Sequence, residues 1–147
     1  MNLEDAERII SIQKIAHNWT GFSQRANHSG HVIGSCQVAT DDGIFIPGVT
    51  ITIEIKAPII TSQCLHLFTI MKMIGKEKRR IYQLEICPIN KRSHNGTPVI
   101  YGPHEHIINE ITTPVVSTDV CCDKWDESLL WFMNRINLHK LTIEKPC

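Results

Sequence analysis

Two histidines stand two residues apart in the segment His104-Glu105-His106, which directly follows Gly102-Pro103. Side chains of a strand alternate between the two faces of its sheet, so an extended backbone here would direct both imidazoles to the same side. Imidazole transfers protons near neutral pH and is a common metal ligand. This pair is therefore the first place in the chain to look for chemistry.

Three interpretations of the histidine pair are open. His94 is the natural third metal ligand, because a hairpin at Asn95-Gly96 would bring it back towards the later strand. Three histidines around an open position would suit catalytic zinc, whose bound water ionises near neutral pH. The alternatives are a metal-free acid–base pair and hydrogen-bonded histidines on a strand face. Because the chain has no H-E-x-x-H pattern, we predict neither a metal nor another cofactor.

The charged residues narrow the class of partner. Lys plus Arg and Asp plus Glu each number 15, and zero net charge argues against a broad, nonspecific grip on nucleic acid. A local patch is still compatible with this balance, and the alternative is an ordinary charged hairpin that keeps a sheet edge soluble. Candidate binding residues for phosphate or an acidic protein surface are Lys78, Arg79 and Arg80 at one end of a predicted strand, and Lys91 and Arg92 near its other end.

Apolar residues at helical spacing predict a helix near each end of the chain. The first covers residues 3–17, with Asn2 as its N-cap and Asp5 near the capping-box position. The last carries a one-sided apolar stripe from Trp125 to Ile136. Trp131 lies off that stripe, so we predict that it is exposed and available to a partner.

Strands are predicted between these helices. Val49 to Ile55 is the clearest, because apolar residues alternate with polar ones over its length, which indicates one buried and one solvated face. Turn signals such as Asp41-Asp42-Gly43 separate the runs. The other predicted strands or extended segments span residues 31–40, 64–73, 81–89, 99–101 and 104–116.

The order of these elements predicts the fold class. A run of strands with no helix between them, flanked by helices, is typical of an α+β fold with an antiparallel sheet. We predict about five or six strands, with the N-terminal and the C-terminal helix packed on the sheet. A chain of 147 residues that is 42% hydrophobic can build one core and is short for two, so we predict a single domain over residues 1–147.

The cysteines and the N-terminus bear on the compartment. The N-terminal Met1–Asp5 is acidic where a secretory signal would be basic, and no apolar run approaches the roughly 20 residues of a membrane span. The chain has no C-x-x-C motif. We therefore expect reduced thiols, a cytoplasmic location and no membrane partner. The six cysteines are Cys36, Cys64, Cys87, Cys121, Cys122 and Cys147.

The strings from His94 to Pro98 and from Tyr101 to Ile107 resemble an uncharacterised family of bacterial and prophage proteins. Members of that family carry a His-x-Asn-Pro-Asp-Gly-like turn followed by a Pro-His-x-His-Ile strand. The resemblance covers most of the chain by layout and is specific between His94 and Ile107. The chain also resembles, less closely, the TumE-like toxins of bacterial toxin–antitoxin systems.

The likeness to TumE-like toxins implies a compact α+β protein with a curved antiparallel sheet, acting in the cytoplasm of a bacterial host cell. The toxin pattern places an Arg and an Asp on the strand before the histidine motif, where this chain has Gln83 and Glu85. Glu85 can stand in for the acid. The missing Arg weakens a phosphate-binding role, because the guanidinium fork is what binds phosphate through two hydrogen bonds.

Two functional hypotheses follow, and the resemblance places both in bacterial or phage conflict. The first is an inhibitor or anti-defence module that binds a protein partner, such as a host defence or toxin–antitoxin component. The alternative is a metal-independent ribonuclease in which His104 or His106 is the general acid or base, aided by Glu85 and His94, while Lys91 or Arg92 contacts the phosphate. Zero net charge and the missing Arg favour the binding module, whereas the likeness to toxins favours RNA as a substrate.

Overall fold

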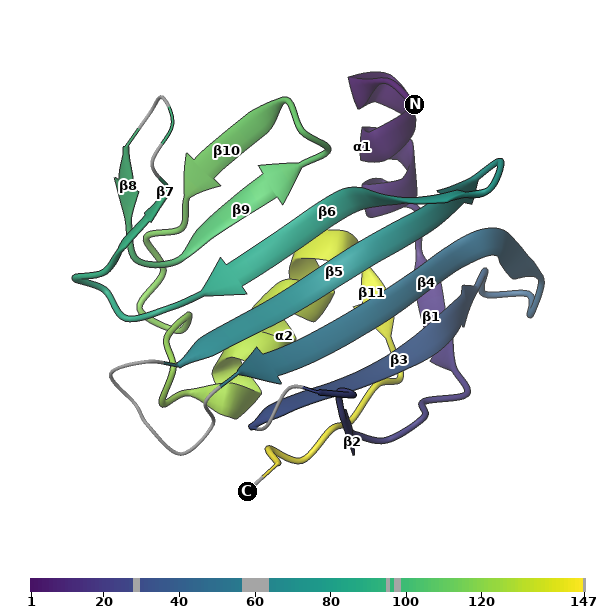
Figure 1. Cartoon of the computed structure of the whole chain (residues 1–147). Coiled ribbons are helices and arrows are strands. Elements are labelled where there is room, and N and C mark those ends of the chain that lie inside the picture. The colour runs from purple at the N-terminus through teal and green to yellow at the C-terminus, as the bar shows by residue number, and fades with distance from the viewer. Residues whose placement is uncertain (28–29, 57–63, 95, 97–98, 147) are drawn as a thin grey trace.

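The computed structural model describes residues 1–27, 30–56, 64–94, 96 and 99–146. Strand accounts for 46% of these residues and helix for 16%, so sheet dominates the fold (Figure 1). Helix α1 spans Leu3–Ser11 and helix α2 spans Trp125–Ile136. The strands are β1 (Lys14–His17), β2 (Ser23–Gln24), β3 (His31–Ala39), β4 (Phe45–Lys56), β5 (Leu65–Ile74), β6 (Glu77–Ile86), β7 (Arg92–His94), β8 (Ile100–Tyr101), β9 (His104–Ile107), β10 (Ile111–Pro114) and β11 (Leu138–His139).

Nine of the described strands form one large sheet, in the order β10-β9-β6-β5-β4-β3-β1-β11, with β2 paired to β3. Neighbours are antiparallel except β1 and β11, which run parallel. Strands β7 and β8 form a separate hairpin. Strand β6 lies beside β9, although a loop and this hairpin separate them along the chain.

The prediction of an α+β fold with a curved antiparallel sheet of about five or six strands is wrong, because the sheet has nine strands and is mixed. The strands that the sequence analysis missed or merged are short. Strands β1 and β10 have four residues each, and β2 and β11 have two each. Segments of two to four residues show at most one repeat of the period-two alternation, which does not separate them clearly from loops.

The helix predicted over residues 3–17 begins as expected and ends early, at Ser11. The side chain of Asn2 accepts from the backbone of Asp5 at 2.8 Å, which confirms the capping box. The backbone leaves the helix at Ile12, and Lys14–His17 then pairs with β3 and β11. Pairing with distant strands thus overrides local apolar spacing, which registers only neighbours along the chain.

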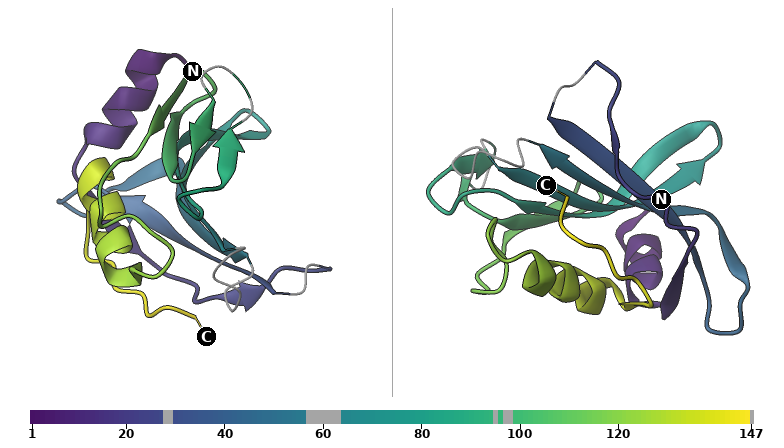
Figure 2. Two further views of the ribbon diagram at one scale, coloured as in Figure 1. Left: turned by 90° about the vertical axis from the view of Figure 1, so that its left-hand side faces the viewer. Right: turned by 90° about the horizontal axis from the view of Figure 1, so that it is seen from below.

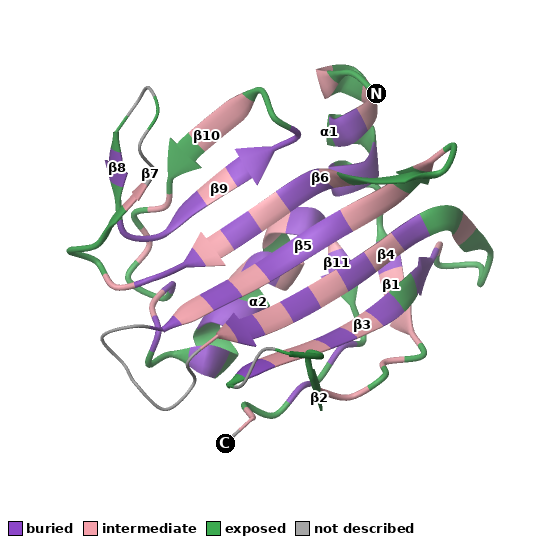
Figure 3. Ribbon diagram, viewed as in Figure 1, coloured by how far each residue is buried: buried purple, intermediate pink, exposed green. Residues whose placement is uncertain are grey.

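Both helices cover the same face of the large sheet, which we call the closed face, and no helix of the described residues lies on the other face (Figures 1 and 2). The sheet curves so that this open face is the inside of the curve (Figure 2). Along β4, Val49, Ile51, Ile53 and Ile55 are buried and the residues between them are half-buried, which confirms the predicted alternation (Figure 3). The core therefore lies between the sheet and the helices.

Helix α2 supplies the predicted apolar stripe to this core, with Trp125, Leu129, Phe132 and Ile136 all buried. The predicted exposure of Trp131 is wrong, and its role in binding a partner stays a prediction. Its side chain is half-buried and packs against the core instead of standing exposed for a partner. Helix α2, which carries Trp131, lies on the closed face of the sheet (Figure 1).

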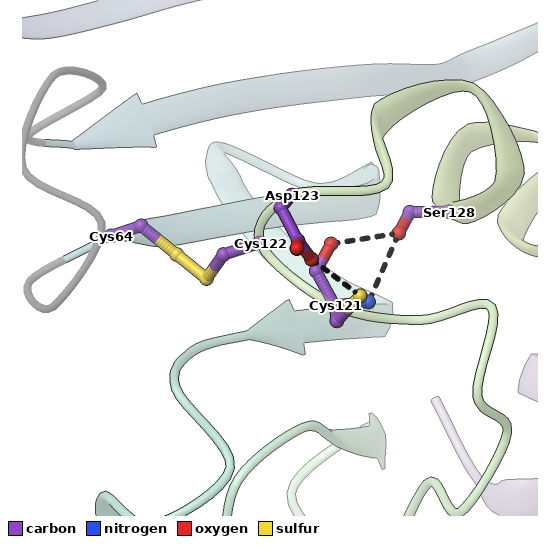
Figure 4. The surroundings of a disulfide bond; sticks show 5 residues. All are labelled: Cys64, Cys121, Cys122, Asp123 and Ser128. Carbon is purple, nitrogen blue, oxygen red and sulfur yellow. Dashed lines mark hydrogen bonds between the residues drawn. A yellow bond between two sulfur atoms is a disulfide. The ribbon is translucent and has the colours of Figure 1, made fainter.

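A disulfide joins Cys64, just before β5, to Cys122, just before α2 (Figure 4). The expectation of reduced thiols is therefore wrong for this pair. Cys36, Cys87 and Cys121 are free, and Cys147 lies outside the described residues. Burial is the main reason why the pKa of the Cys121 thiol is raised, so this neighbour of the disulfide is not an activated thiolate.

Candidate functional site

Strand β9 sends its two histidines to one face and Glu105 to the other. In register, His104 lies opposite Glu85 of β6, and His106 lies opposite Gln83. The two imidazole rings are edge to face, with centroids 4.7 Å apart. The prediction that both histidines point to the same side is confirmed, and that side is the open face.

Glu85, His104 and His106 converge into what we call the carboxylate–histidine cluster. Glu85 Oε2 lies 3.3 Å from His104 Nε2, and Glu85 Oε1 lies 3.9 Å from His106 Nε2. One side-chain atom of each residue falls within 4.8 Å of the other two. His104 is fully buried, His106 is 9% exposed, and Glu85 is half-buried. The cluster thus has one solvent-facing edge, formed by Glu85 and His106.

Two groups on the side of the ring away from Glu85 fix the orientation of His104. Its Nδ1 lies 3.1 Å from the carbonyl oxygen of Gly102 and 3.1 Å from Ser93 Oγ. Ser93 Oγ has its shortest contact, 2.7 Å, with the same carbonyl. A carbonyl oxygen only accepts, so the network assigns the proton to Nδ1 and directs Nε2 at Glu85.

Gly102 is required at its position. It adopts φ +78°, and a Cβ there would come within 3.1 Å of backbone atoms of Ile89. Other residues would be strained in this conformation and would also collide. The tight turn aims the Gly102 carbonyl at His104. On the other side of the cluster, Thr112 Oγ1 of β10 lies 3.2 Å from His106 Nδ1.

His94, the predicted third histidine, lies in β7, where its backbone pairs with Ile100. Its side chain and Asn95 of the predicted turn lie outside the described residues. The neighbouring Ser93 reaches His104, so the β7–β8 hairpin does contact the cluster.

Arg80 supplies a guanidinium beside the position where the toxin pattern has an Arg. Its Nη1 donates to Gln83 Oε1 at 2.9 Å, and its Nη2 donates to Asn109 Oδ1 at 3.1 Å. Gln83 Nε2 in turn donates to Thr69 Oγ1 at 2.9 Å. Burial lowers the pKa of Arg80, and the charge of Glu85 opposes that shift.

A groove of about 970 Å³ lies on the open face, next to the cluster. Its charges are largely paired: Arg25 contacts Glu54 at 2.9 Å, and Arg79 contacts Glu77 at 3.1 Å. His31 also lies 3.1 Å from Glu54, and burial lowers its pKa despite that carboxylate. The residues lining the groove include Arg25, Thr52, Glu54, Thr69, Glu77, Lys78, Arg79, Arg80, Gln83, Asn109 and Glu110.

The predicted basic residues divide between two places. Lys78, Arg79 and Arg80 line the groove. Lys91 and Arg92 are exposed beyond the far end of β6 and are not among the described residues that line it. The two groups are therefore not one patch.

Three residues that support the cluster were not predicted from the sequence: Ser93, Gly102 and Thr112. The sequence predicts one extended segment over residues 104–116, which would not bring Thr112 beside His106. The chain turns there at Ile108, which has φ +45°, a conformation that β-branched residues rarely adopt. Asn109, directly after Ile108, was the one residue type there that favours a turn. The glycine before Pro103 was the one available signal for the other side of the cluster.

Within the described part of the chain, neither helix has the length and apolar character needed to cross a membrane. Comparison with known proteins finds no matching family model, curated protein or solved structure. The resemblances to the prophage family and to TumE-like toxins therefore stay predictions.

Proposed function

We propose that the protein acts by binding a segment of a partner protein in the groove on the open face. The observation that carries this proposal is the groove itself, a concavity of about 970 Å³ on a sheet face that no described helix covers. Specific recognition needs a shaped surface with polar groups at fixed positions. Ion pairs and the Arg80–Gln83 contact hold the polar groups of this groove in place.

The charge of the groove favours a protein over RNA. Among the described residues that line it are four Lys and Arg side chains, of which Arg25 and Arg79 are already paired with carboxylates, and Glu110 adds a further negative charge. Binding to a nucleic acid backbone requires Lys and Arg side chains whose positive charge is not already paired with carboxylates. A polypeptide with charges of both signs complements such a surface better.

The class of partner rests on the sequence resemblance alone. It suggests an inhibitor or anti-defence module that binds a host defence or toxin–antitoxin component in the cytoplasm of a bacterial cell. The Cys64–Cys122 disulfide bears on that location, because disulfides persist mainly in oxidising compartments. Thiol labelling of protein taken directly from bacterial cytosol tests the cytoplasmic location. In a reducing cytoplasm we expect both cysteines to be labelled completely.

Affinity capture from a bacterial lysate tests the groove. The Lys78→Glu/Arg80→Glu double variant should lose a partner that the wild type retains, by at least tenfold in recovered amount. The Lys91→Glu/Arg92→Glu variant is the matched control, since it makes the same charge change outside the groove. Equal recovery with both variants would exclude the groove as the binding surface.

One observation favours a second function, the metal-independent ribonuclease: Glu85, His104 and His106 do converge. A catalytic base must come within hydrogen-bond reach of its substrate, and of the two histidines only His106 is partly exposed. Incubation with a mixed-sequence RNA in excess chelator tests this. Cleavage that disappears in His106→Ala would support the ribonuclease, and intact RNA with the folded wild type would reject it.

A further inference from the structure

We propose that Glu85, His104 and His106 bind one divalent transition-metal ion, of the class of zinc or iron(II). The ligands would be one carboxylate and the Nε2 atoms of both imidazoles. This site is distinct from the groove, whose lining includes none of these three residues. This proposal differs from the prediction made from the sequence, which is that no metal binds. The third ligand proposed here is Glu85, whereas the third ligand considered from the sequence is His94.

The spacing of the ligand atoms suits such an ion. Atoms bound at about 2.1 Å around a tetrahedral ion stand roughly 3.4 Å from one another. Glu85 Oε2 lies 3.3 Å from His104 Nε2 and Glu85 Oε1 lies 3.9 Å from His106 Nε2, and one ligand atom of each residue lies within 4.8 Å of the other two. Small rotations of Glu85 and His106 would close the site, whereas the more rigid His104 already has the required distance.

The direction of the His104 lone pair is the second argument. The Gly102 carbonyl lies on the Nδ1 side of the ring, which leaves Nε2, directed at a carboxylate oxygen 3.3 Å away, as the ring atom that can bind a metal ion. A metal ion bound between Nε2 and the carboxylate would take the place of a proton shared by the two groups. A divalent ion would meet one formal negative charge and two neutral nitrogen ligands, which is a favourable charge balance.

The surroundings of both histidines match those of metal ligands. A metal-bound histidine usually hydrogen-bonds through its other ring nitrogen, which fixes the ring and its tautomer. His104 does so with Gly102 and Ser93, and His106 does so with Thr112. Each of the two rings is therefore held by a group outside the cluster, with its Nε2 directed inward.

The donor set selects the class of metal. Two imidazoles and a carboxylate suit zinc, iron(II), cobalt and nickel, whereas magnesium and calcium prefer oxygen ligands alone. Three protein ligands leave at least one coordination position open. The partly exposed edge at Glu85 and His106 gives the ion a route from solvent and would let the open position hold water or a ligand.

Titration of the metal-free full-length protein tests the site, with zinc followed by calorimetry and cobalt(II) by visible absorption. We expect one zinc per chain, a cobalt spectrum of nitrogen and oxygen ligands without thiolate charge transfer, and no binding of magnesium. Glu85→Gln and His106→Ala should each weaken zinc binding at least tenfold, and Thr112→Val by a smaller factor. His139→Ala removes an exposed histidine outside the cluster and should leave the affinity unchanged.

Circular dichroism tests whether each variant is folded. If His106→Ala does not fold, the zinc affinity of Glu85→Gln tests the site alone. A wild type that binds zinc no more tightly than Glu85→Gln would overturn the proposal. A thiolate-type cobalt spectrum would overturn it as well, because it would locate the ion at the free cysteines. Neither result depends on whether a partner protein binds the groove.

Discussion

Glu85 and Glu105 are carboxylates on the paired strands β6 and β9, and they project from opposite faces of the sheet. On the closed face, Glu105 accepts from the Tyr82 hydroxyl at 2.7 Å and from Arg135 Nε of α2 at 3.0 Å. On the open face, Glu85 meets two imidazoles. Glu105 thus has a permanent cation as its partner, whereas the partners of Glu85 can change charge. The first arrangement fastens a helix to the sheet, and the second is suited to binding and chemistry.

Other buried polar groups on the closed face also hold the fold together. The ammonium of Lys14 donates to the carbonyls of Ile10 at 2.9 Å and Ile12 at 2.7 Å, and also to that of Ile136. It therefore joins the C-terminal ends of both helices, where the helix dipoles favour a cation. Burial nevertheless lowers its pKa to about 8. The distinction between the two faces can be tested residue by residue.

The largest effect on stability is expected for Lys14→Met. The substitution keeps an unbranched chain but leaves three inward carbonyls without their donor, which should cost about 3 kcal/mol of unfolding free energy. Urea denaturation measures it, and the exposed Lys140→Met is the control. A loss below about 1 kcal/mol would mean that water replaces the ammonium and that Lys14 does not fasten the helices.

The next effect is a pH dependence caused by His66, which is buried on the closed face against Trp125. Burial, with a smaller contribution from the charge of Lys145, lowers its pKa to about 4. The unfolded chain then binds more protons than the folded one between pH 6.5 and pH 4, so stability falls as pH falls through this window.

Between pH 7 and pH 5 we expect His66 to account for a loss of about 2 kcal/mol. His66→Phe should remove that part of the slope, and the comparison is made by urea denaturation at each pH. Equal slopes in wild type and variant would show that other groups set the pH dependence.

The sequence revealed the parts of the fold that repeat a pattern. Val49 to Ile55 has enough alternating residues to identify its buried face, and the stripe on α2 was equally clear. Lys14–His17 was assigned to a helix because its partners, β3 and β11, lie far away along the chain. Long-range pairing decides such short strands, and local propensity does not.

The candidate site was predictable to a similar extent. Spacing alone places His104 and His106 on one face, but their contact with Glu85 depends on the register of β9 against β6. A shift of one residue would send Glu85 to the other face. Arg80 shows this effect directly, because a bulge at Ile81 brings its side chain to the same face as Gln83. No residue type in the sequence marked that bulge.

A smaller effect is expected for Glu105→Gln, which preserves the shape of the side chain but removes its charge. Arg135 would then lose its ion pair in a half-buried position, at a cost of about 1.5 kcal/mol. A double-mutant cycle with Arg135→Gln should return a coupling of about 1 kcal/mol. Additive losses would show that the pair is not what holds α2 to β9.

The smallest effect on stability is expected for the matching change on the open face, Glu85→Gln. In the metal-free protein the free energy of unfolding should change by no more than about 0.5 kcal/mol, because no permanent cation loses an ion pair. Added zinc should make the free energies of unfolding of the two proteins differ. At one hundred times its dissociation constant, zinc would stabilise the wild type by about 2.7 kcal/mol and the variant far less. A loss near that of Glu105→Gln without metal would mean that Glu85 also fastens the fold. The two faces would then differ in their partners but not in their roles.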